Sequence, residues 1–248
     1  YVEWSVNEKS ALEVAAGASI ADARTMVTMK QVGLNVASDP VMSLSYIGIK
    51  GGMVVVVADD PGPISSQTEQ DTRQFGVFSK IPVFDPSSPE EAFDYSEKYN
   101  TPGILRPTTR VCHVSTFINV DDTRRKIQPE GFVKDSKWVI FPRLSYQSHL
   151  DIEKRNVIIA DDFSAYPFNK ISGSGKKGII AGGVSCAYAK EALALLKGSC
   201  KLMKVATPYP FPEKQALAFM EGLDEILVIE ELSPCAANTG FLLKSGAK

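Results

Sequence analysis

The chain has 248 residues, 44% of them hydrophobic and 23% charged, a balance typical of a globular protein with a sizeable core. It has 27 lysines and arginines against 29 acidic residues, and this net charge of −2 argues against a nucleic-acid-binding or membrane-surface protein. The longest apolar run, Met53 to Ala58, is far shorter than the roughly 20 residues of a membrane-spanning helix. Four scattered cysteines without a CxxC pair indicate neither a disulfide framework nor a zinc or iron–sulfur site, and favour a reducing, cytoplasmic compartment.

The first part of the chain alternates helix-like and strand-like stretches. Helices are predicted at 9–21, 39–46, 68–79 and 89–99, strands at 25–28, 53–58 and 103–106, and a polar loop at 30–35. The unbroken β-branched run at 53–58 is typical of a strand covered on both faces. Strands that alternate with helices predict a parallel sheet with crossover helices, and therefore an α/β domain at residues 1–119.

Residues 120–174 are charged and poorly periodic, and they are interpreted as a connecting segment with one helix near 143–156. Regular patterns return after this segment. Strands are predicted at 177–181, 201–205 and 225–229, with helices at 185–197 and 213–221 between them. Residues 175–248 are therefore predicted to form a second, smaller βαβαβ domain.

Common catalytic and metal-binding motifs do not occur in the sequence. The two histidines, His113 and His149, stand without a G-x-S-x-G or H-E-x-x-H pattern, which disfavours a serine-hydrolase triad and zinc chemistry. Gly182-Gly183-Val184-Ser185 lies between a predicted strand and helix. It is either an anion site at a helix start or, as we favour, a tight turn capped by Ser185.

Two polar loops follow predicted strands of the first domain, at the sheet edge where open α/β folds bind ligands. They are residues 30–35 and 59–73. Ser65, Ser66 and Arg73 in the second loop suit a small anionic ligand, and Arg73 could bind a carboxylate through two parallel hydrogen bonds. Loops of this composition are also often only solvated, so both interpretations stay open.

The start of the first predicted helix contains a carboxylate with two possible roles. Ser5-Val6-Asn7-Glu8 fits a capping box, in which Ser5 caps the helix and Glu8 reaches back to the Ser5 amide. The helix that follows is rich in alanine and glycine, and such small residues let a neighbouring group come close. Glu8 is thus either a structural cap or a carboxylate available to a ligand.

Several long stretches, in order along the chain, are closely similar to one protein family. They lie at 1–9, 13–19, 29–40, 59–63, 65–73, 105–110, 166–170 and 208–214. Among them are Met-Lys-Gln-Val-Gly-Leu-Asn at 29–35 and Leu-Arg-Pro-Thr-Thr-Arg at 105–110. These stretches resemble the large subunit of indolepyruvate ferredoxin oxidoreductases, which belong to the thiamine-diphosphate-dependent 2-oxoacid:ferredoxin oxidoreductases.

The resemblance implies a pyrimidine-binding thiamine domain, a parallel sheet with helices on both faces, followed by an α/β domain like the C-terminal one of transketolase. It implies a cytoplasmic oligomer with a second subunit that oxidatively decarboxylates arylpyruvates to acyl-CoA and CO₂ and passes electrons to ferredoxin. The family's diphosphate-binding domain and cysteine-rich tail match no part of this sequence, and the start of the first domain is also missing. Mg²⁺ and [4Fe–4S] clusters are therefore expected from other modules or partners, and this chain is expected to be inactive alone.

The resemblance also assigns roles to individual residues. Glu8 matches the glutamate that contacts the aminopyrimidine of thiamine diphosphate, where a carboxylate favours the imino tautomer that takes the thiazolium C2 proton. Glu3 is the fallback carboxylate. The expected cofactor-binding residues are Glu8, Gln31 and Asn35, and the expected substrate-binding residues are Ser65, Ser66 and Arg73.

Two alternatives stay open. The chain is either part of this enzyme or a non-catalytic assembly or regulatory module that keeps the fold, and the absent modules motivate the second view. A related enzyme acting on pyruvate or 2-oxoglutarate is the other alternative, because pocket shape cannot be predicted from one sequence.

Overall fold

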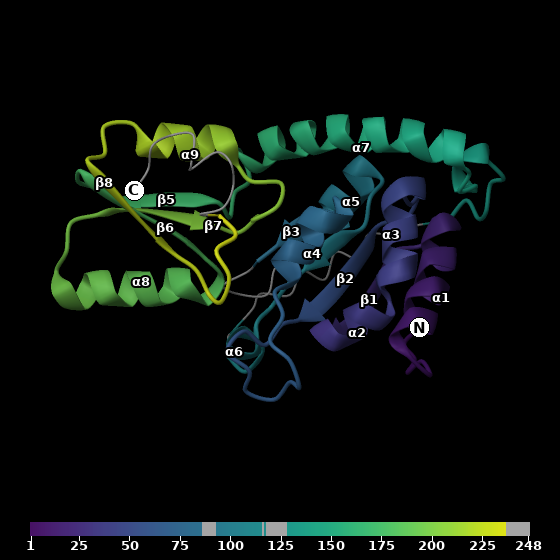
Figure 1. Cartoon of the computed structure of the whole chain (residues 1–248), viewed down its shortest axis with the longest axis horizontal. Coiled ribbons are helices and arrows are strands. Elements are labelled where there is room, and N and C mark those ends of the chain that lie inside the picture. The colour runs from purple at the N-terminus through teal and green to yellow at the C-terminus, as the bar shows by residue number, and fades with distance from the viewer. Residues whose placement is uncertain (86–92, 116, 118–127, 237–248) are drawn as a thin grey trace.

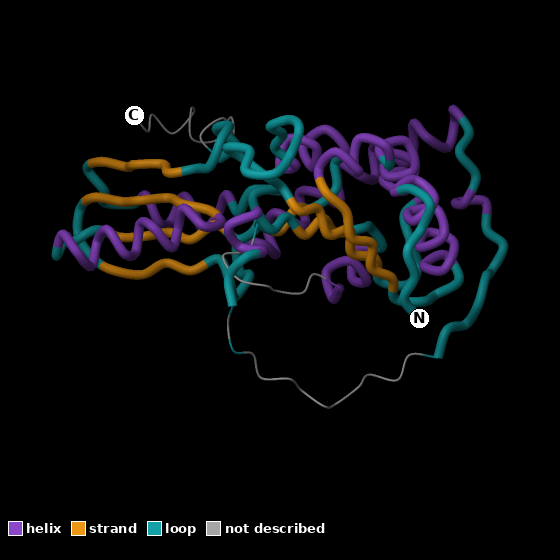
Figure 2. Tube along the Cα trace, turned by 90° about the horizontal axis from the view of Figure 1, so that it is seen from below, coloured by secondary structure: helices purple, strands orange, loops and turns teal. Residues whose placement is uncertain are grey.

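The structure, a computed structural model, describes residues 1–85, 93–115, 117 and 128–236. Within these residues two four-stranded sheets lie one after the other along the long axis of the molecule, each between helices (Figure 1). Figure 2 shows the strands of the two sheets as separate groups. The predicted α/β class, with helices on both faces of a parallel sheet, is confirmed.

The first sheet is parallel throughout and has the strand order β1-β2-β4-β3. Its strands are β1 (Thr25–Lys30), β2 (Met53–Ala58), β3 (Val83–Phe84) and β4 (Gly103–Leu105). One face is covered by α1 (Glu8–Ile20), α2 (Gln31–Val36), α3 (Ser38–Ile47) and α4 (Thr72–Ser79). The other face packs against α5 (Phe93–Tyr99) and the end of α7 (Pro142–Phe163). Because β2 is buried from both sides, it has the continuous apolar sequence that predicted it.

The second sheet has the order β5-β7-β6-β8 and mixes strand directions. Strands β6 (Lys177–Gly182), β7 (Lys201–Val205) and β8 (Glu225–Ile229) are parallel, whereas β5 (Lys170–Gly173) pairs antiparallel with β7. Helix α8 (Gly183–Leu196) covers one face and α9 (Glu213–Met220) the other (Figure 1).

Most predicted elements are confirmed, and the strands at 53–58, 201–205 and 225–229 have the predicted bounds. The predicted loop at 30–35 is wrong, because Lys30 ends β1 and the following residues form α2. The helix predicted from residue 68 begins at Thr72, since Asp71 caps it. The elements that were not predicted are β3, β5, α6 (Thr109–Cys112) and the 3₁₀ turn Ser136–Trp138. The predicted helix start at Pro89 lies outside the described residues.

Helix α7 and the segment after β7 join the two sheets. Ile159 and Phe163 of α7 are fully buried against the first sheet, and α7 also contacts α9. The Val83 amide donates to the Tyr209 carbonyl at 2.7 Å, and the Asp85 amide donates to the Ala206 carbonyl at 2.8 Å. The segment predicted as a connection, residues 120–174, thus contains the longest helix described and an edge strand of the second sheet; the domain boundaries at 119 and 174 stay a prediction.

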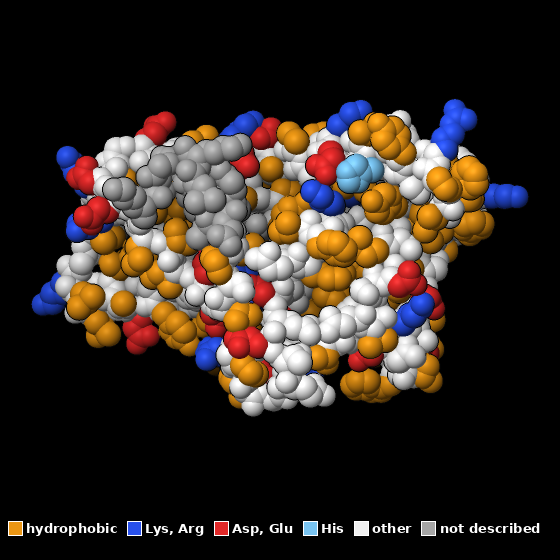
Figure 3. Space-filling model, viewed as in Figure 1, with side chains coloured by type: hydrophobic (Ala, Val, Ile, Leu, Met, Phe, Trp, Pro, Cys, Tyr) orange, Lys and Arg blue, Asp and Glu red, His pale blue; other side chains and the backbone are white. Residues whose placement is uncertain are grey.

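The surface shows no segregation of charge on the face in view. Acidic and basic side chains are scattered over both halves of this face, and apolar side chains gather near α7 and α1 (Figure 3). Within the described part of the chain, no helix combines the length and the apolar character needed to cross a membrane.

Candidate active site

Helix α1 begins at Glu8 and is capped by Asn7 rather than Ser5. The Asn7 side chain accepts a hydrogen bond from the Ser10 amide at 2.9 Å, which satisfies one of the free N–H groups of the first turn. The predicted capping box is therefore wrong: Ser5 lies before the helix, and Glu8 is its first residue. An asparagine directly before the helix can reach the first-turn amides, so the Glu8 carboxylate is not needed for capping.

The Glu8 side chain packs against the backbone of α2. A Cβ added to Gly33 would lie 2.6 Å from Glu8 Cγ and 2.8 Å from Glu8 Oε1. Real Cβ atoms do not come this close, so the partly exposed Glu8 side chain occupies space that only a glycine at position 33 leaves. This contact brings the predicted catalytic carboxylate to the segment 30–35 that was predicted to bind the cofactor.

The start of α2, which follows β1, and the loop that follows β2 meet at the carboxyl edge of the first sheet. Gln31 is 1% exposed, and its Nε2 donates to the Thr68 carbonyl at 3.3 Å, whereas its buried Oε1 has no hydrogen-bond partner among the described residues. Lys30 Nζ donates to the Ser65 carbonyl at 3.4 Å. Asn35 lies further along α2 with an exposed side chain. The structure therefore brings Glu8, Gln31 and the stretch 65–68 to one edge.

Asp60, which was not among the predicted site residues, organises the loop that carries the two serines. Its Oδ2 accepts hydrogen bonds from the backbone amides of Ile64, Ser65 and Ser66 at 3.0, 2.7 and 2.9 Å. Its Oδ1 accepts from the Thr109 hydroxyl at 2.8 Å. These hydrogen bonds, led by that of Ser65, hold the pKa of the Asp60 carboxyl well below its usual range. The sequence feature that could have predicted this role is an aspartate directly before Pro-Gly-Pro, because aspartate side chains often accept hydrogen bonds from the backbone of such turns.

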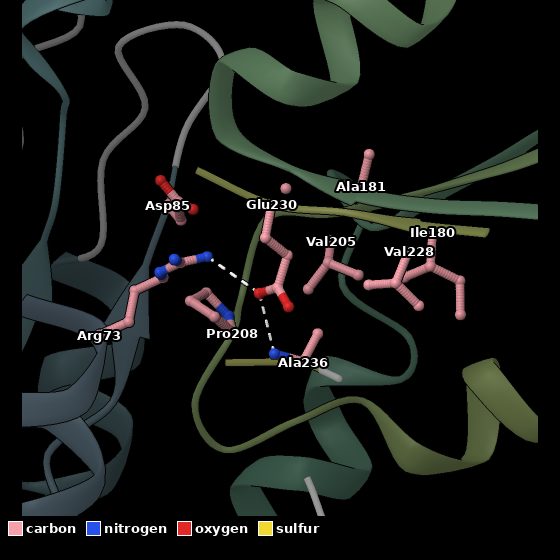
Figure 4. Close-up of a pocket in the computed structure, with 10 residues that line it drawn as sticks. Arg73, Asp85, Ile180, Ala181, Val205, Pro208, Val228, Glu230 and Ala236 are labelled. Carbon is pink, nitrogen blue, oxygen red and sulfur yellow. Dashed lines mark hydrogen bonds and ion pairs between the residues drawn. The ribbon is translucent and has the colours of Figure 1, made fainter. Parts of the chain in front are cut away.

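The structure places Arg73 in the junction between the sheets, where the residue is 2% exposed. The guanidinium donates to Asp71 at 2.7 Å, to Glu230 at 3.0 Å, and to the carbonyl oxygens of Glu231 and Ser233 at 2.6 and 3.0 Å. Figure 4 shows Arg73 pointing towards Glu230 from the opposite side of the junction. Because protein groups occupy its donors, we do not retain Arg73 among the residues proposed to contact a substrate.

A second buried arginine extends this junction. Arg106, 1% exposed, donates from Nε to Asp59 at 2.6 Å and from Nη1 to Asp85 at 3.2 Å. Asp59 also accepts a hydrogen bond from the Thr72 amide at 2.8 Å. Burial raises the pKa of the Asp85 carboxyl, although Arg106 opposes that shift. The cluster links the ends of β2, β3 and β4 to the start of α4.

The Gly182–Gly183 turn faces Asp85. A Cβ added to Gly183, whose φ is +49°, would lie 3.0 Å from Asp85 Oδ1. The anion beside the start of α8 is thus a carboxylate of the chain itself. The prediction that Ser185 caps this turn is wrong, because α8 begins at Gly183 and has Gly182 at its cap position.

Two cavities are described, and both lie away from Glu8. A cavity of about 10 Å³ in the junction is bordered by Arg73, Asp85 and Glu230, and it has room for about one water molecule. A groove of about 550 Å³ lies between α4, α7 and α9, with Asn156, Tyr209 and Phe211 in its wall. Within the described residues no group of three or more His, Cys, Asp or Glu side chains could hold a metal ion.

Comparison with known proteins relates this chain to one oxidoreductase subunit. No family model matches the sequence. The indolepyruvate oxidoreductase subunit IorA of Pyrococcus horikoshii is 44% identical over 251 residues, which cover 94% of this chain and 39% of the relative. Over that length the chain is similar to IorA. It spans less than half of the IorA sequence, so the match concerns part of that subunit.

Solved structures share the fold of this chain. A 2-oxoglutarate:ferredoxin oxidoreductase from Magnetococcus marinus superposes with a TM-score of 0.69 at 18% identity, covering 98% of this chain and 52% of its own. A split-gene transketolase superposes with a TM-score of 0.59 at 15% identity, covering 97% of this chain and 70% of its own. Both likenesses extend over both sheets and show that the α/β fold is shared.

Proposed function

We propose that this chain supplies the pyrimidine-binding half of a thiamine diphosphate site in an oxidoreductase that oxidatively decarboxylates arylpyruvates of the indolepyruvate type. The similarity to IorA supports the reaction class. The observation that carries the site is the placement of Glu8: a carboxylate not used for capping, packed against a glycine at the ligand-binding edge of a parallel sheet.

The residues at this edge fit an aminopyrimidine. Such a ring presents a nitrogen that pairs with a carboxyl group and an amino group that donates hydrogen bonds. Glu8 supplies the carboxyl group, and the buried Gln31 Oε1 is an acceptor without a partner among the described residues. Gly33 lets the Glu8 side chain pack directly against the backbone of α2, which fixes its position at this edge. We therefore propose Glu8 and Gln31 as the residues that hold the ring, with Asn35 at its exposed side and Ser65 and Ser66 facing the substrate.

Thiamine diphosphate, when bound, supplies a carbon nucleophile and an electron sink for the decarboxylation. The role of Glu8 is to hold a proton at a ring nitrogen and so keep the amino group of that ring basic. The role of Asp60 is to fix the backbone of residues 64–66 through its three amide hydrogen bonds. Gln31 limits the ring to one orientation, because its amide is buried and tethered to Thr68.

The complete enzyme requires parts outside these residues. We propose that a diphosphate-binding thiamine domain with Mg²⁺, [4Fe–4S] clusters and a second subunit complete it, with coenzyme A and ferredoxin as acyl and electron acceptors. We further propose domains at residues 1–119 and 175–248, in a cytoplasmic oligomer. The names of the matched proteins support the 2-oxoacid and ferredoxin parts of this proposal.

The experiment that tests this function is the Glu8→Gln substitution in the assembled oxidoreductase. General acid–base contributions of this kind amount to about 100-fold or more, so we expect arylpyruvate-dependent ferredoxin reduction to fall at least that far. Glu13→Gln is the matched control, because Glu13 lies on the same helix with a side chain that is 55% exposed. An E8Q enzyme that keeps most of its rate would contradict the proposed role.

Calorimetry distinguishes a role of this chain in the enzyme from a role as an assembly or regulatory module. Titration of the assembled protein with thiamine diphosphate and Mg²⁺ should show saturable binding, and E8Q should weaken it. If the wild-type assembly binds no thiamine diphosphate, the chain has an assembly or regulatory role instead. Turnover of indolepyruvate, phenylpyruvate, pyruvate and 2-oxoglutarate, compared in the same preparation, tests the substrate class.

A further inference from the structure

Lys30 stands out among the cations at the carboxyl edge of the first sheet. It ends β1 and occupies the cap position of α2, with an exposed side chain. Its ammonium makes one hydrogen bond within the described part of the chain, to the Ser65 carbonyl at 3.4 Å. That distance is long for a hydrogen bond, and an ammonium has three donors, so Lys30 keeps donors for a further partner.

The neighbouring cations are already paired with carboxylates. Arg73 and Arg106 are buried in the junction with Asp71, Glu230, Asp59 and Asp85. Arg110 pairs with Glu231 at 3.2 Å, and Lys9 pairs with Asp39 at 3.1 Å. In the part of the chain that the structure describes, Lys30 makes no such ion pair. An anion arriving at this edge therefore meets Lys30 as its available positive charge.

The nearby carboxylates do not compete for this ammonium. Asp60 is 1% exposed, and its two oxygens accept four hydrogen bonds from the loop and from Thr109. Asp59 is fully buried against Arg106. Lys30 lies directly before α2 and three residues before Gly33, on which Glu8 packs. Lys30 and Glu8 thus lie at the same end of α2.

We propose that Lys30 binds the carboxylate of the 2-oxoacid, the part first predicted for Arg73. The inference rests on the proposed function and adds a specificity residue to it. Lysine is a compact charge on a flexible stem, so it can follow a carboxylate without the fixed fork geometry of arginine. The carboxylate charge spreads onto the rest of the substrate as CO₂ departs. Lys30 therefore stabilises the bound substrate more than it stabilises the transition state. Its loss should raise KM more than it lowers kcat.

The test uses Lys30→Met and Lys30→Arg in the assembled enzyme. A charge-assisted hydrogen bond corresponds to about tenfold or more in affinity, so K30M should raise KM for indolepyruvate about tenfold or more and change kcat less than threefold. K30R should recover most of that loss, because it keeps the charge. Lys154→Met is the control, since Lys154 lies on the exposed side of α7 with its ammonium 3.7 Å from Asp151. A KM that is unchanged in K30M would overturn the proposal.

Inhibitors distinguish recognition of the carboxylate charge by Lys30 from a packing role of the Lys30 side chain. Indole-3-acetate carries the carboxylate without the oxo group, and indole-3-acetamide is its neutral counterpart. K30M should weaken inhibition by the acid about tenfold and leave inhibition by the amide within twofold. Equal weakening of both would assign Lys30 a packing role and contradict carboxylate recognition.

Failure of this inference and failure of the proposed function give different results. If wild-type assembly binds no thiamine diphosphate and turns over no 2-oxoacid, the proposed function is wrong. If thiamine diphosphate binds with the same affinity in wild type and K30M, turnover proceeds and KM is unchanged, the function stands and Lys30 is not the carboxylate ligand.

Discussion

The carboxyl edges of the two sheets have the same architecture but different uses. In the first sheet the edge carries α2, the loop held by Asp60 and the Glu8 side chain, and several of its polar groups face outward. In the second sheet the corresponding edge is buried: the Ala206 carbonyl accepts from Asp85, and the Gly182–Gly183 turn packs on the Asp85 carboxylate. Open α/β sheets bind ligands at this edge. The second sheet uses it to hold the first.

The two edges differ because the chain pairs its charges internally at the junction but not at the outer edge of the first sheet. Four carboxylates and two arginines lie together at the junction, where each charge needs partners because burial removes its water. The outer edge keeps Lys30 and Glu8 partly in solvent, where an unpaired charge costs little. A sheet edge is thus left available to a ligand when the chain does not satisfy its polar groups internally.

The largest effect is expected at the junction. Arg106→Met leaves Asp59 and Asp85 without their shared cation, so the free energy of unfolding should fall by about 3–5 kcal/mol. Lys177→Met, which removes an exposed pair with Glu225 on the second sheet, should lower the free energy of unfolding far less, because solvent screens that pair. Denaturant unfolding of both variants measures the contrast. Equal losses would show that the junction is not the buried ionic element that the contacts indicate.

An intermediate, pH-dependent effect is expected at Asp60. Its pKa is lowered in the folded protein, so the charged carboxylate stabilises the fold above its unfolded pKa of about 4, and this contribution declines as the pH falls below that value. Asp60→Asn has no such charge to lose. The difference in unfolding free energy between wild type and D60N should therefore be largest near neutral pH and shrink towards pH 3. A constant difference over that range would contradict the role of the charge.

The smallest effect on stability is expected at Gly33. Alanine there would meet the Glu8 side chain and displace it, while its higher helix propensity offsets part of the strain. G33A in the assembled enzyme should bind thiamine diphosphate about tenfold more weakly, which corresponds to about 1.4 kcal/mol. Gly17→Ala is the control: a Cβ there meets nothing within 4 Å, so G17A should stabilise α1 by up to about 1 kcal/mol and leave binding unchanged. If G33A binds thiamine diphosphate with unchanged affinity, Glu8 is not part of the cofactor site.

Much of the candidate site follows from local sequence. The matched motifs around Glu8 and Gln31 and the polar composition of residues 59–73 predicted that these segments share one sheet edge, and the contacts of Gln31 with Thr68 and of Lys30 with Ser65 place them together. Asp60 was missed because its partners are amides of its own loop, which a pattern of side chains does not display. Lys30 was named only as the first residue of a loop that proved to be a helix.

The sequence alone determined the positions of the main strands and helices, the α/β class and the carboxylate at the head of α1, because residues close in the chain dictate these features. Only the tertiary structure decided that Asn7 caps α1, that β5 adds an antiparallel edge strand, and that Arg73 bonds to Glu230, 157 positions away. Such pairings depend on how sheets and loops pack. A guanidinium ready to bind a ligand and one buried in an ion pair have the same local sequence.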